Sequence, residues 1–147
     1  MEKILLIVDL EESYLTDDDI LNLIRDEYWD EVRQDMKRLF DKIVEKTKEL
    51  KKKGFKIHFT GEEEPYGDLK YIVDEILPYW FENKQFIKNY YNDNQIVVLG
   101  GLFRERCVHA VNQIIKNSIV SKELTISHGV IGDCEGRYFK YNFSDIT

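Results

Sequence analysis

The sequence predicts an α/β fold, with a three-layer, doubly wound and mostly parallel β-sheet that carries helices on both faces. Residues 3–8 form an almost unbroken apolar run, which is typical of a strand buried on both faces of a parallel sheet. Residues 29–53 place apolar side chains at three- and four-residue steps, the period of a helix with one buried face. Because strand-like and helix-like segments alternate along the chain, we expect parallel strands joined by right-handed crossovers.

Five segments are predicted to be strands of this sheet, and an aromatic tail is predicted to add an edge strand. The five segments are residues 3–8, 55–60, 86–88, 96–99 and 124–127, and the tail is residues 136–147, where aromatic and polar residues alternate. Seven residues, Asn89–Gln95, separate the third predicted strand from the fourth. A crossover between parallel strands needs roughly ten or more residues. Either these two strands are arranged differently, or the segment before Ile96 is a loop.

Four helices are predicted between the strands. The longest covers residues 29–53 and stops at Gly54, after three lysines that complement the helix dipole. A short helix at residues 20–24 is capped by the acidic residues 17–19. The remaining two cover residues 66–77, ended by Pro78, and residues 107–117.

Length, charge and cysteine content limit the possible organisation and function. A chain of 147 residues is predicted to form a single domain, residues 1–147. The net charge of -7 argues against general nucleic-acid binding, which needs a basic surface. The sequence shows no signal-peptide pattern, and no apolar run approaches the ~20 residues of a membrane span. The two cysteines, Cys107 and Cys134, match neither a zinc site nor a disulfide framework, so a cytoplasmic location is expected.

Three chemically useful side chains fall at the predicted ends of strands. Asp9 follows the first strand, Lys88 ends the third, and Cys107 follows the fourth at the start of a helix. Ligands of doubly wound sheets bind at the carboxyl ends of the strands, so these side chains are expected to converge there. The helix N-terminus and the nearby arginines favour a thiolate at Cys107. Asp9 would take the thiol proton and later return it to the leaving group, and Lys88 would keep Asp9 ionised. The Gly100-Gly101 turn would offer backbone N–H groups to an oxyanion.

Two motifs resemble the isochorismatase-like cysteine hydrolase superfamily, which includes nicotinamidases and carbamoylsarcosine amidases. Residues 7–14, Ile-Val-Asp-Leu-Glu-Glu-Ser-Tyr, are similar to the opening of that family, where a strand ends in an Asp and an aromatic follows. Residues 100–108, Gly-Gly-Leu-Phe-Arg-Glu-Arg-Cys-Val, are similar to its turn and Cys-Val. The order of elements agrees along the whole chain, and these two motifs carry the close similarity.

The resemblance implies a role for each matching residue. It implies that Cys107 is the nucleophile, that Asp9 is the acid/base, and that Lys88 is the lysine, with Lys84 as its rival. It also implies a non-proline cis peptide at Leu102–Phe103 or a neighbouring bond. Residues beside the substrate are then expected to be Leu102, Phe103, Arg104 and Tyr14.

The chain also departs from the family pattern. The Asp-x-His of metal-binding members is absent after the second strand, where Glu62–Glu64 stand, so neither a metal site nor another cofactor is expected. Glu11 replaces the usual amide, and Phe103 and Arg104 replace small or polar turn residues. From its position after the fifth strand, His128 is expected to line the pocket.

Three hypotheses for function remain open. The first is a hydrolase that uses Cys107 to cleave a C–N amide-type bond of a small, non-peptide molecule. The second is a catalytically degenerate family member that binds a small molecule or a protein, in which Cys107 and Asp9 are structural. The third is magnesium-dependent phosphate chemistry at Asp9. It is less favoured because Glu11 and Ser13 stand where the Asp-x-Asp-x-Thr motif needs Asp and Thr. A homo-oligomer is expected from the aromatic tail, and neither nucleic acid nor a membrane is expected as a partner.

Overall fold

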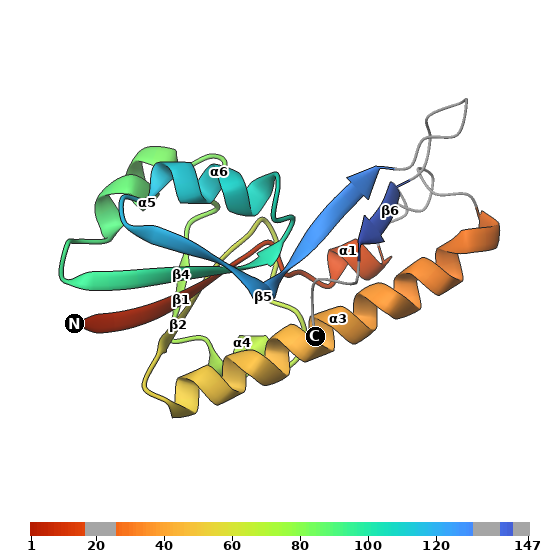
Figure 1. The fold of residues 1–147 in the computed structure, drawn as a ribbon, viewed down its shortest axis with the longest axis horizontal. Coiled ribbons are helices and arrows are strands. Elements are labelled where there is room, and N and C mark those ends of the chain that lie inside the picture. Colours follow the sequence, from red (N-terminus) through yellow and green to blue (C-terminus); the bar gives the residue numbers. More distant parts are fainter. Residues whose placement is uncertain (17–25, 131–138, 143–147) are drawn as a thin grey trace.

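The computed structural model describes residues 1–16, 26–130 and 139–142. Figure 1 shows the elements, which are β1 (Glu2–Val8), α1 (Ser13–Thr16), α3 (Asp26–Lys52), β2 (Lys56–Thr60), α4 (Leu69–Ile72), β3 (Glu75–Leu77), α5 (Lys84–Tyr90), β4 (Gln95–Leu102), α6 (Cys107–Ile114), β5 (Ser118–Val130) and β6 (Phe139–Asn142). The predicted helix at residues 20–24 and most of the predicted aromatic edge strand lie outside the described residues. Of that tail, the structure describes residues 139–142, which form β6. No helix among the described residues combines the length and apolar character needed to cross a membrane.

A mostly parallel sheet forms the centre of the molecule, which confirms the predicted fold class. The strand order is β3-β2-β1-β4-β5-β6, and the first five strands of this order run parallel to their neighbours. β6 pairs with β5 in the antiparallel direction. At the carboxyl end of β1, Val8 lies opposite Thr60 of β2 and Gly101 of β4. This register brings the residue after β1 and the turn after β4 to the same edge of the sheet.

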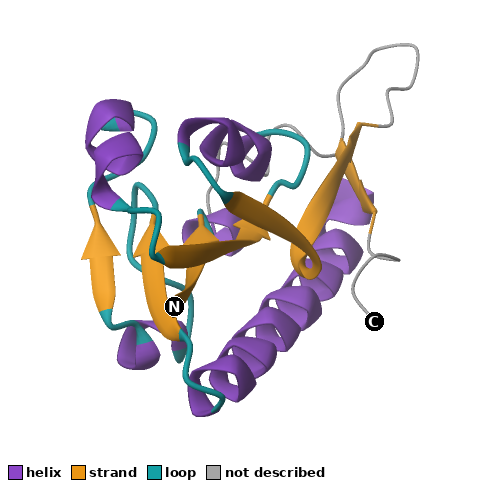
Figure 2. Ribbon diagram, turned by 60° about the vertical axis from the view of Figure 1, so that its left-hand side comes forward, coloured by secondary structure: helices purple, strands orange, loops and turns teal. Residues whose placement is uncertain are grey.

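Helices cover both faces of the sheet (Figures 1 and 2). α3 and α4 lie on one face, and α5 and α6 lie on the other. β1 supplies both cores, because its side chains point alternately to the two faces. Leu5 and Ile7 pack with α3, while Ile4, Leu6 and Val8 pack with α5 and α6. Every one of these five side chains is fully buried, which explains why the sequence of this strand is a continuous apolar run.

Two predicted elements are wrong, and they are linked. Residues 86–88 were predicted as the third strand but lie inside the helix α5, where Ile87 is buried while Phe86 and Lys88 are exposed. The third strand is instead β3, which lies within the predicted helix at residues 66–77. α4 keeps only a single turn, Leu69–Ile72, of that helix. The short gap before β4 is therefore no crossover between parallel strands, because α5 is itself the crossover helix.

Asp74 explains why the predicted helix at residues 66–77 ends early. Its backbone N–H donates to the carbonyl of Ile57 at 2.7 Å, and its carboxylate accepts the Ile57 N–H at 2.8 Å. Lys51 of α3 holds the other carboxylate oxygen at 3.0 Å. These contacts draw the chain onto the β2 edge, and β3 follows at once. The long-range contacts therefore override the local helical pattern.

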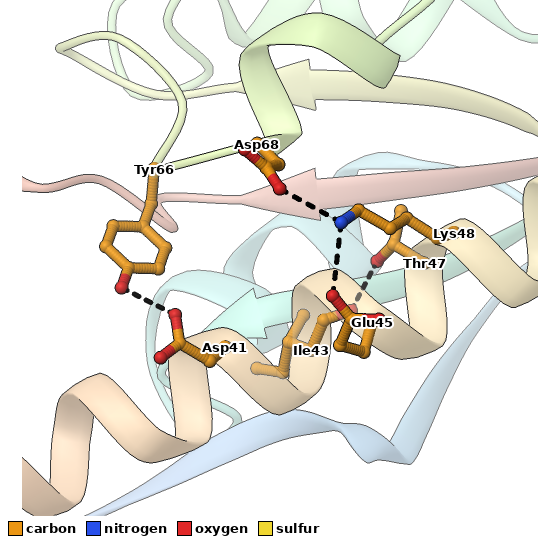
Figure 3. A network of polar contacts seen from close by, with 7 residues as sticks. All are labelled: Asp41, Ile43, Glu45, Thr47, Lys48, Tyr66 and Asp68. Atoms are coloured by element: carbon orange, nitrogen blue, oxygen red, sulfur yellow. Dashed lines mark hydrogen bonds and ion pairs between the residues drawn. The ribbon is translucent and has the colours of Figure 1, made fainter.

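Hydrogen bonds and ion pairs hold residues 61–68, the segment that follows β2, against α3 (Figure 3). The Tyr66 hydroxyl donates to the Asp41 carboxylate at 2.7 Å, and Lys48 bridges Asp68 and Glu45 at 3.0 and 3.1 Å. Within α3, the Thr47 hydroxyl donates to the carbonyl of Ile43. Residues 61–68 thus leave the carboxyl end of β2 and are held in a defined path, which matters because this segment borders the site described next.

Candidate active site

Asp9 is held by the backbone at the carboxyl end of β1. Its φ angle is 57°, in the left-handed region that Asp and Asn tolerate better than most side chains. Its backbone N–H donates to the carbonyl of Thr60 at the end of β2, at 2.9 Å. The residue is only 2% exposed. A carboxylate at this position is therefore buried and fixed.

Cys107 reaches the same edge through the turn that follows β4. Gly101 has a φ angle of 110°, and a Cβ there would lie 2.0 Å from the carbonyl oxygen of Val8. Only glycine therefore allows this end of β4 to lie against β1. The turn then closes with the N–H groups of Arg106 and Val108 donating to the Phe103 carbonyl, at 3.0 and 3.1 Å, and α6 begins at Cys107.

The structure brings Cys107 and Asp9 together. The Cys107 thiol lies close enough to the Asp9 carboxylate for each group to shift the pKa of the other, and Cys107 is partly buried. The indole N–H of Trp80 faces the same carboxylate and lies 3.2 Å from each oxygen. Trp80 is placed by Thr60, whose hydroxyl accepts the Trp80 N–H and donates to the Pro78 carbonyl, both at 3.0 Å. Residues that follow β1, β3 and β4 thus build a three-membered cluster of carboxylate, indole and thiol, and Thr60 at the end of β2 positions the indole.

Burial sets the protonation of the pair. It raises the pKa of Asp9 from 3.8 to about 7, although the interactions with Cys107 and Trp80 oppose the rise. Burial also raises the pKa of the Cys107 thiol from 9.0 to about 12, and the neighbouring charge of Asp9 adds to this. The prediction that the helix N-terminus favours a thiolate is wrong here, because desolvation and the adjacent carboxylate outweigh the helix and Arg106. At rest the thiol keeps its proton, and Asp9 is the group that titrates near neutral pH.

Neither candidate lysine is placed on Asp9. Lys88 is an exposed residue near the end of α5, and Lys84 lies over the Phe81 ring at 4.9 Å. Within the described residues, Asp9 has no ion pair with a lysine or arginine, and Trp80 faces its carboxylate instead. Sequence reasoning missed Trp80. The available signal was the run Pro78-Tyr79-Trp80-Phe81, but its position at a strand end depends on β3, which was predicted as helix.

The other predicted site residues divide into two groups. Tyr14 and Phe103 lie together, with their rings in an edge-to-face contact at 5.6 Å, and the charges of Asp9 and Cys107 add to the burial that raises the pKa of Tyr14. Leu102 is fully buried in the core on the α3 face. Arg104 is bonded to β5, through Nε to the Thr125 hydroxyl at 2.7 Å. His128 lies on β5 opposite Tyr141, and its side chain is outside the described part of the chain.

Arg104 stabilises an irregular stretch of β5. The pairing register of β4 and β5 jumps between Leu99 and Gly101, which lie opposite Val120 and Thr125. The Arg104 guanidinium donates to the carbonyls of Lys122 and Thr125, each at 3.0 Å, and so spans the extra residues of β5. These contacts direct the Arg104 side chain toward the irregular stretch of β5. Arg104 therefore has a structural role there, which the sequence of the turn did not indicate.

Glu11 connects Asp9 to the segment after β2. Its backbone N–H donates to the Asp9 carbonyl, and its buried carboxylate accepts the N–H of Glu63, both at 2.9 Å. Gly61 is required beside it, because a Cβ there would lie 2.6 Å from the Glu11 carboxylate. Where the family pattern has an amide, this chain therefore has a carboxylate that anchors a neighbouring loop.

Two further expectations concern the backbone and metals. All peptide bonds of the described residues are trans, so the cis bond expected at Leu102–Phe103 is absent. In the same part of the chain, no group of three or more His, Cys, Asp or Glu side chains is arranged to hold a metal ion. Comparisons of the chain with protein-family models, curated proteins and solved structures give no match.

Proposed function

We propose that the chain is a cysteine-dependent hydrolase that cleaves a C–N amide-type bond of a small, non-peptide molecule, as its resemblance to the isochorismatase-like family implies. The observation that carries the proposal is the proximity of the Cys107 thiol and the buried Asp9 carboxylate, each of which shifts the pKa of the other, at the carboxyl edge of parallel strands. Nucleophilic catalysis needs a base beside the nucleophile, and Asp9 lies beside Cys107. An Asp9 pKa of about 7 suits a group that must take up and return a proton near neutral pH.

The chemistry proceeds in two halves. The Cys107 sulfur forms a bond to the carbonyl carbon while its proton passes to Asp9, and the C–N bond then breaks as Asp9 returns that proton to the leaving amine. Water next attacks the resulting thioester and gives a proton to Asp9. The C–S bond then breaks as Asp9 returns that proton to the sulfur, which releases a carboxylic acid and restores the thiol. The backbone N–H of Cys107, the first residue of α6, has no acceptor within that helix and is available to the developing oxyanion.

We expect Cys107→Ala to abolish turnover and Asp9→Asn to lower kcat by at least about 100-fold, because general acid–base catalysis contributes factors of that size. The measurement is ammonia release from a panel of small primary amides. Activity of the parent protein is expected to rise with pH through about 7, because Asp9 accepts a proton only when it is ionised. Adding hydroxylamine is expected to yield a hydroxamate, since it intercepts a thioester on Cys107.

Lys88→Ala is the control variant in the ammonia-release assay. Lys88 lies exposed on α5, so its substitution is expected to leave turnover within about twofold of the parent. Release of ammonia that persists in Cys107→Ala, or its loss in Lys88→Ala, would contradict the assigned roles.

The alternative proposal is a catalytically degenerate member that binds and sequesters a small molecule or a protein. The observation favouring it is the Trp80 indole on Asp9, in place of the lysine that the family pattern supplies. Saturable binding of an amide with no ammonia release and no hydroxamate, in a protein whose fold is intact, would support this alternative.

A further inference from the structure

Carboxylates gather on one side of the Asp9–Cys107 pair. Glu11 is 3% exposed and is bonded through its backbone to Asp9, and its carboxylate is bonded to the backbone of Glu63. This anchoring fixes the loop that carries Glu62 against the site. The charges of Glu11 and Glu62 both raise the pKa of Asp9, in support of this proximity. The cluster is thus part of the built site, held by hydrogen bonds at both ends.

The positive side chains of the neighbourhood offset this charge only in part. Arg104 is turned onto β5, where its guanidinium meets Thr125 and the Lys122 carbonyl. Arg106 is exposed, and its charge acts on the Cys107 thiol against the larger effects of burial and Asp9. Neither Lys84 nor Lys88 forms an ion pair with the described carboxylates of the site. Among the residues that the structure describes, the charges acting on the thiol are therefore mainly negative.

Aromatic rings complete the surroundings. The Tyr14 ring meets Phe103 at 5.6 Å, and the Tyr79 ring meets Trp80 at 6.0 Å, each in an edge-to-face contact. Tyr79 also lies within the influence of the carboxylates, because Asp9 and Glu62 add to the burial that raises its pKa to about 12. Aromatic faces attract organic cations, and the attraction grows where water is excluded.

We propose that this site selects small amides that carry a positive charge, such as an ammonium or quaternary ammonium group, and disfavours anionic ones. The amide part of this statement rests on the hydrolase function proposed above. The preference for positive charge is a property of the residues around Cys107 and holds whether or not turnover occurs. The two parts can therefore be tested separately.

Charged thiol reagents test the preference directly. The probes are 2-(trimethylammonium)ethyl methanethiosulfonate, which is cationic, and 2-sulfonatoethyl methanethiosulfonate, which is anionic, applied to a Cys134→Ser background. In each case the Cys107 sulfur forms a disulfide with the reagent and methanesulfinate leaves. The ratio of the two rates, divided by the same ratio for N-acetylcysteine amide, is expected to be about tenfold in favour of the cation at low salt, and to fall as salt is added.

Two matched variants locate the origin of the preference. Glu62→Gln is expected to reduce the normalised ratio by about threefold, because it removes one of the charges that act on Asp9. Glu49→Gln removes the charge of another exposed glutamate, on α3, and it is expected to leave the ratio unchanged. A normalised ratio near one in the parent, or the same ratio in the parent and Glu62→Gln, would overturn the proposal.

Three amides of similar size extend the test to substrates: 4-aminobutanamide, butanamide and succinamate, which are cationic, neutral and anionic. The expected order of kcat/KM is cationic, then neutral, then anionic. Turnover in the opposite order overturns the charge preference but leaves the hydrolase function intact. Absence of turnover of all three, together with a cation-selective labelling ratio, counts against the hydrolase function and supports the charge preference.

Discussion

Asp9→Asn is expected to raise the free energy of unfolding by up to about 4 kcal/mol at pH 8. Burial raises the pKa of Asp9 from 3.8 to about 7, so the folded protein holds a proton there that the unfolded chain has released. The stability that this proton provides is fully present below about pH 4 and is lost as the pH rises through 7. Each tenfold change in the acid dissociation constant corresponds to about 1.4 kcal/mol, which sets the size of the effect. Asn has no proton to lose, and it tolerates the left-handed backbone of this position.

Urea unfolding of both proteins from pH 4 to pH 8 measures this effect. The advantage of Asp9→Asn is expected to be small at pH 4 and to grow to its full size above pH 7. Asp93→Asn is the matched control, because Asp93 is exposed and lies 3.8 Å from Lys116. Its effect is expected to stay within about 0.5 kcal/mol at every pH. A loss of stability in Asp9→Asn that is equal at pH 4 and pH 8 would mean that the ionised carboxylate is stabilised in the fold.

Gly101→Ala is expected to destabilise the protein by more than about 4 kcal/mol. A Cβ at this position would lie 2.0 Å from the Val8 carbonyl oxygen and 2.7 Å from the Val8 nitrogen, and both belong to the backbone of the central strand β1. The φ angle of 110° adds further strain for any residue with a side chain. Relief would require β4 to separate from β1, and effects of this size come from such forced changes in a core.

Gly54→Ala is the comparison that separates the cost of backbone strain from the cost of the steric clash between β4 and β1 at Gly101. Gly54 has a φ angle of 97° but no atom within 4 Å of the Cβ that a side chain would add. Its substitution is expected to cost only about 1 kcal/mol, the contribution of the left-handed conformation alone. Thermal or urea unfolding of the two variants measures the difference. Equal costs for the two alanines would show that β4 and β1 can move apart freely at this point.

The parts of the fold that sequence predicted correctly are those whose local pattern agrees with their burial. β1 is buried on both faces and reads as an unbroken apolar run, and α3 repeats its apolar residues with a helical period. The segment from residue 66 to residue 91 was assigned wrongly, because its structure depends on contacts far away in the chain. Asp74 bonds to β2, and α5 is short, with Ile87 as its fully buried residue. A segment of three residues, such as 86–88, is too short to show whether its apolar side chains repeat with the period of a strand or of a helix.

The candidate site could likewise be predicted from the sequence only in part. Asp9 and Cys107 could be predicted as neighbours, because both follow strands that end at one edge of a parallel sheet. Trp80 could not, since it is 71 positions from Asp9 and reaches it through the Thr60 hydroxyl. The raised pKa of the thiol also depends on burial by distant segments, whereas the sequence shows only the helix start and the nearby arginines.

The central claim is that Cys107 and Asp9 form one interacting pair, and the pH dependence of Cys107 alkylation tests it most directly. Iodoacetamide is applied to a Cys134→Ser background, and the rate is followed by mass spectrometry with and without Asp9→Asn. With Asp9 present, the rate is expected to keep rising through pH 10, because the thiol pKa is about 12. Asp9→Asn is expected to move the midpoint down toward the ordinary value of 9.0, since the adjacent charge is gone. A midpoint at or below that value in the parent, or one that Asp9→Asn leaves unchanged, would contradict the pairing of Cys107 with Asp9.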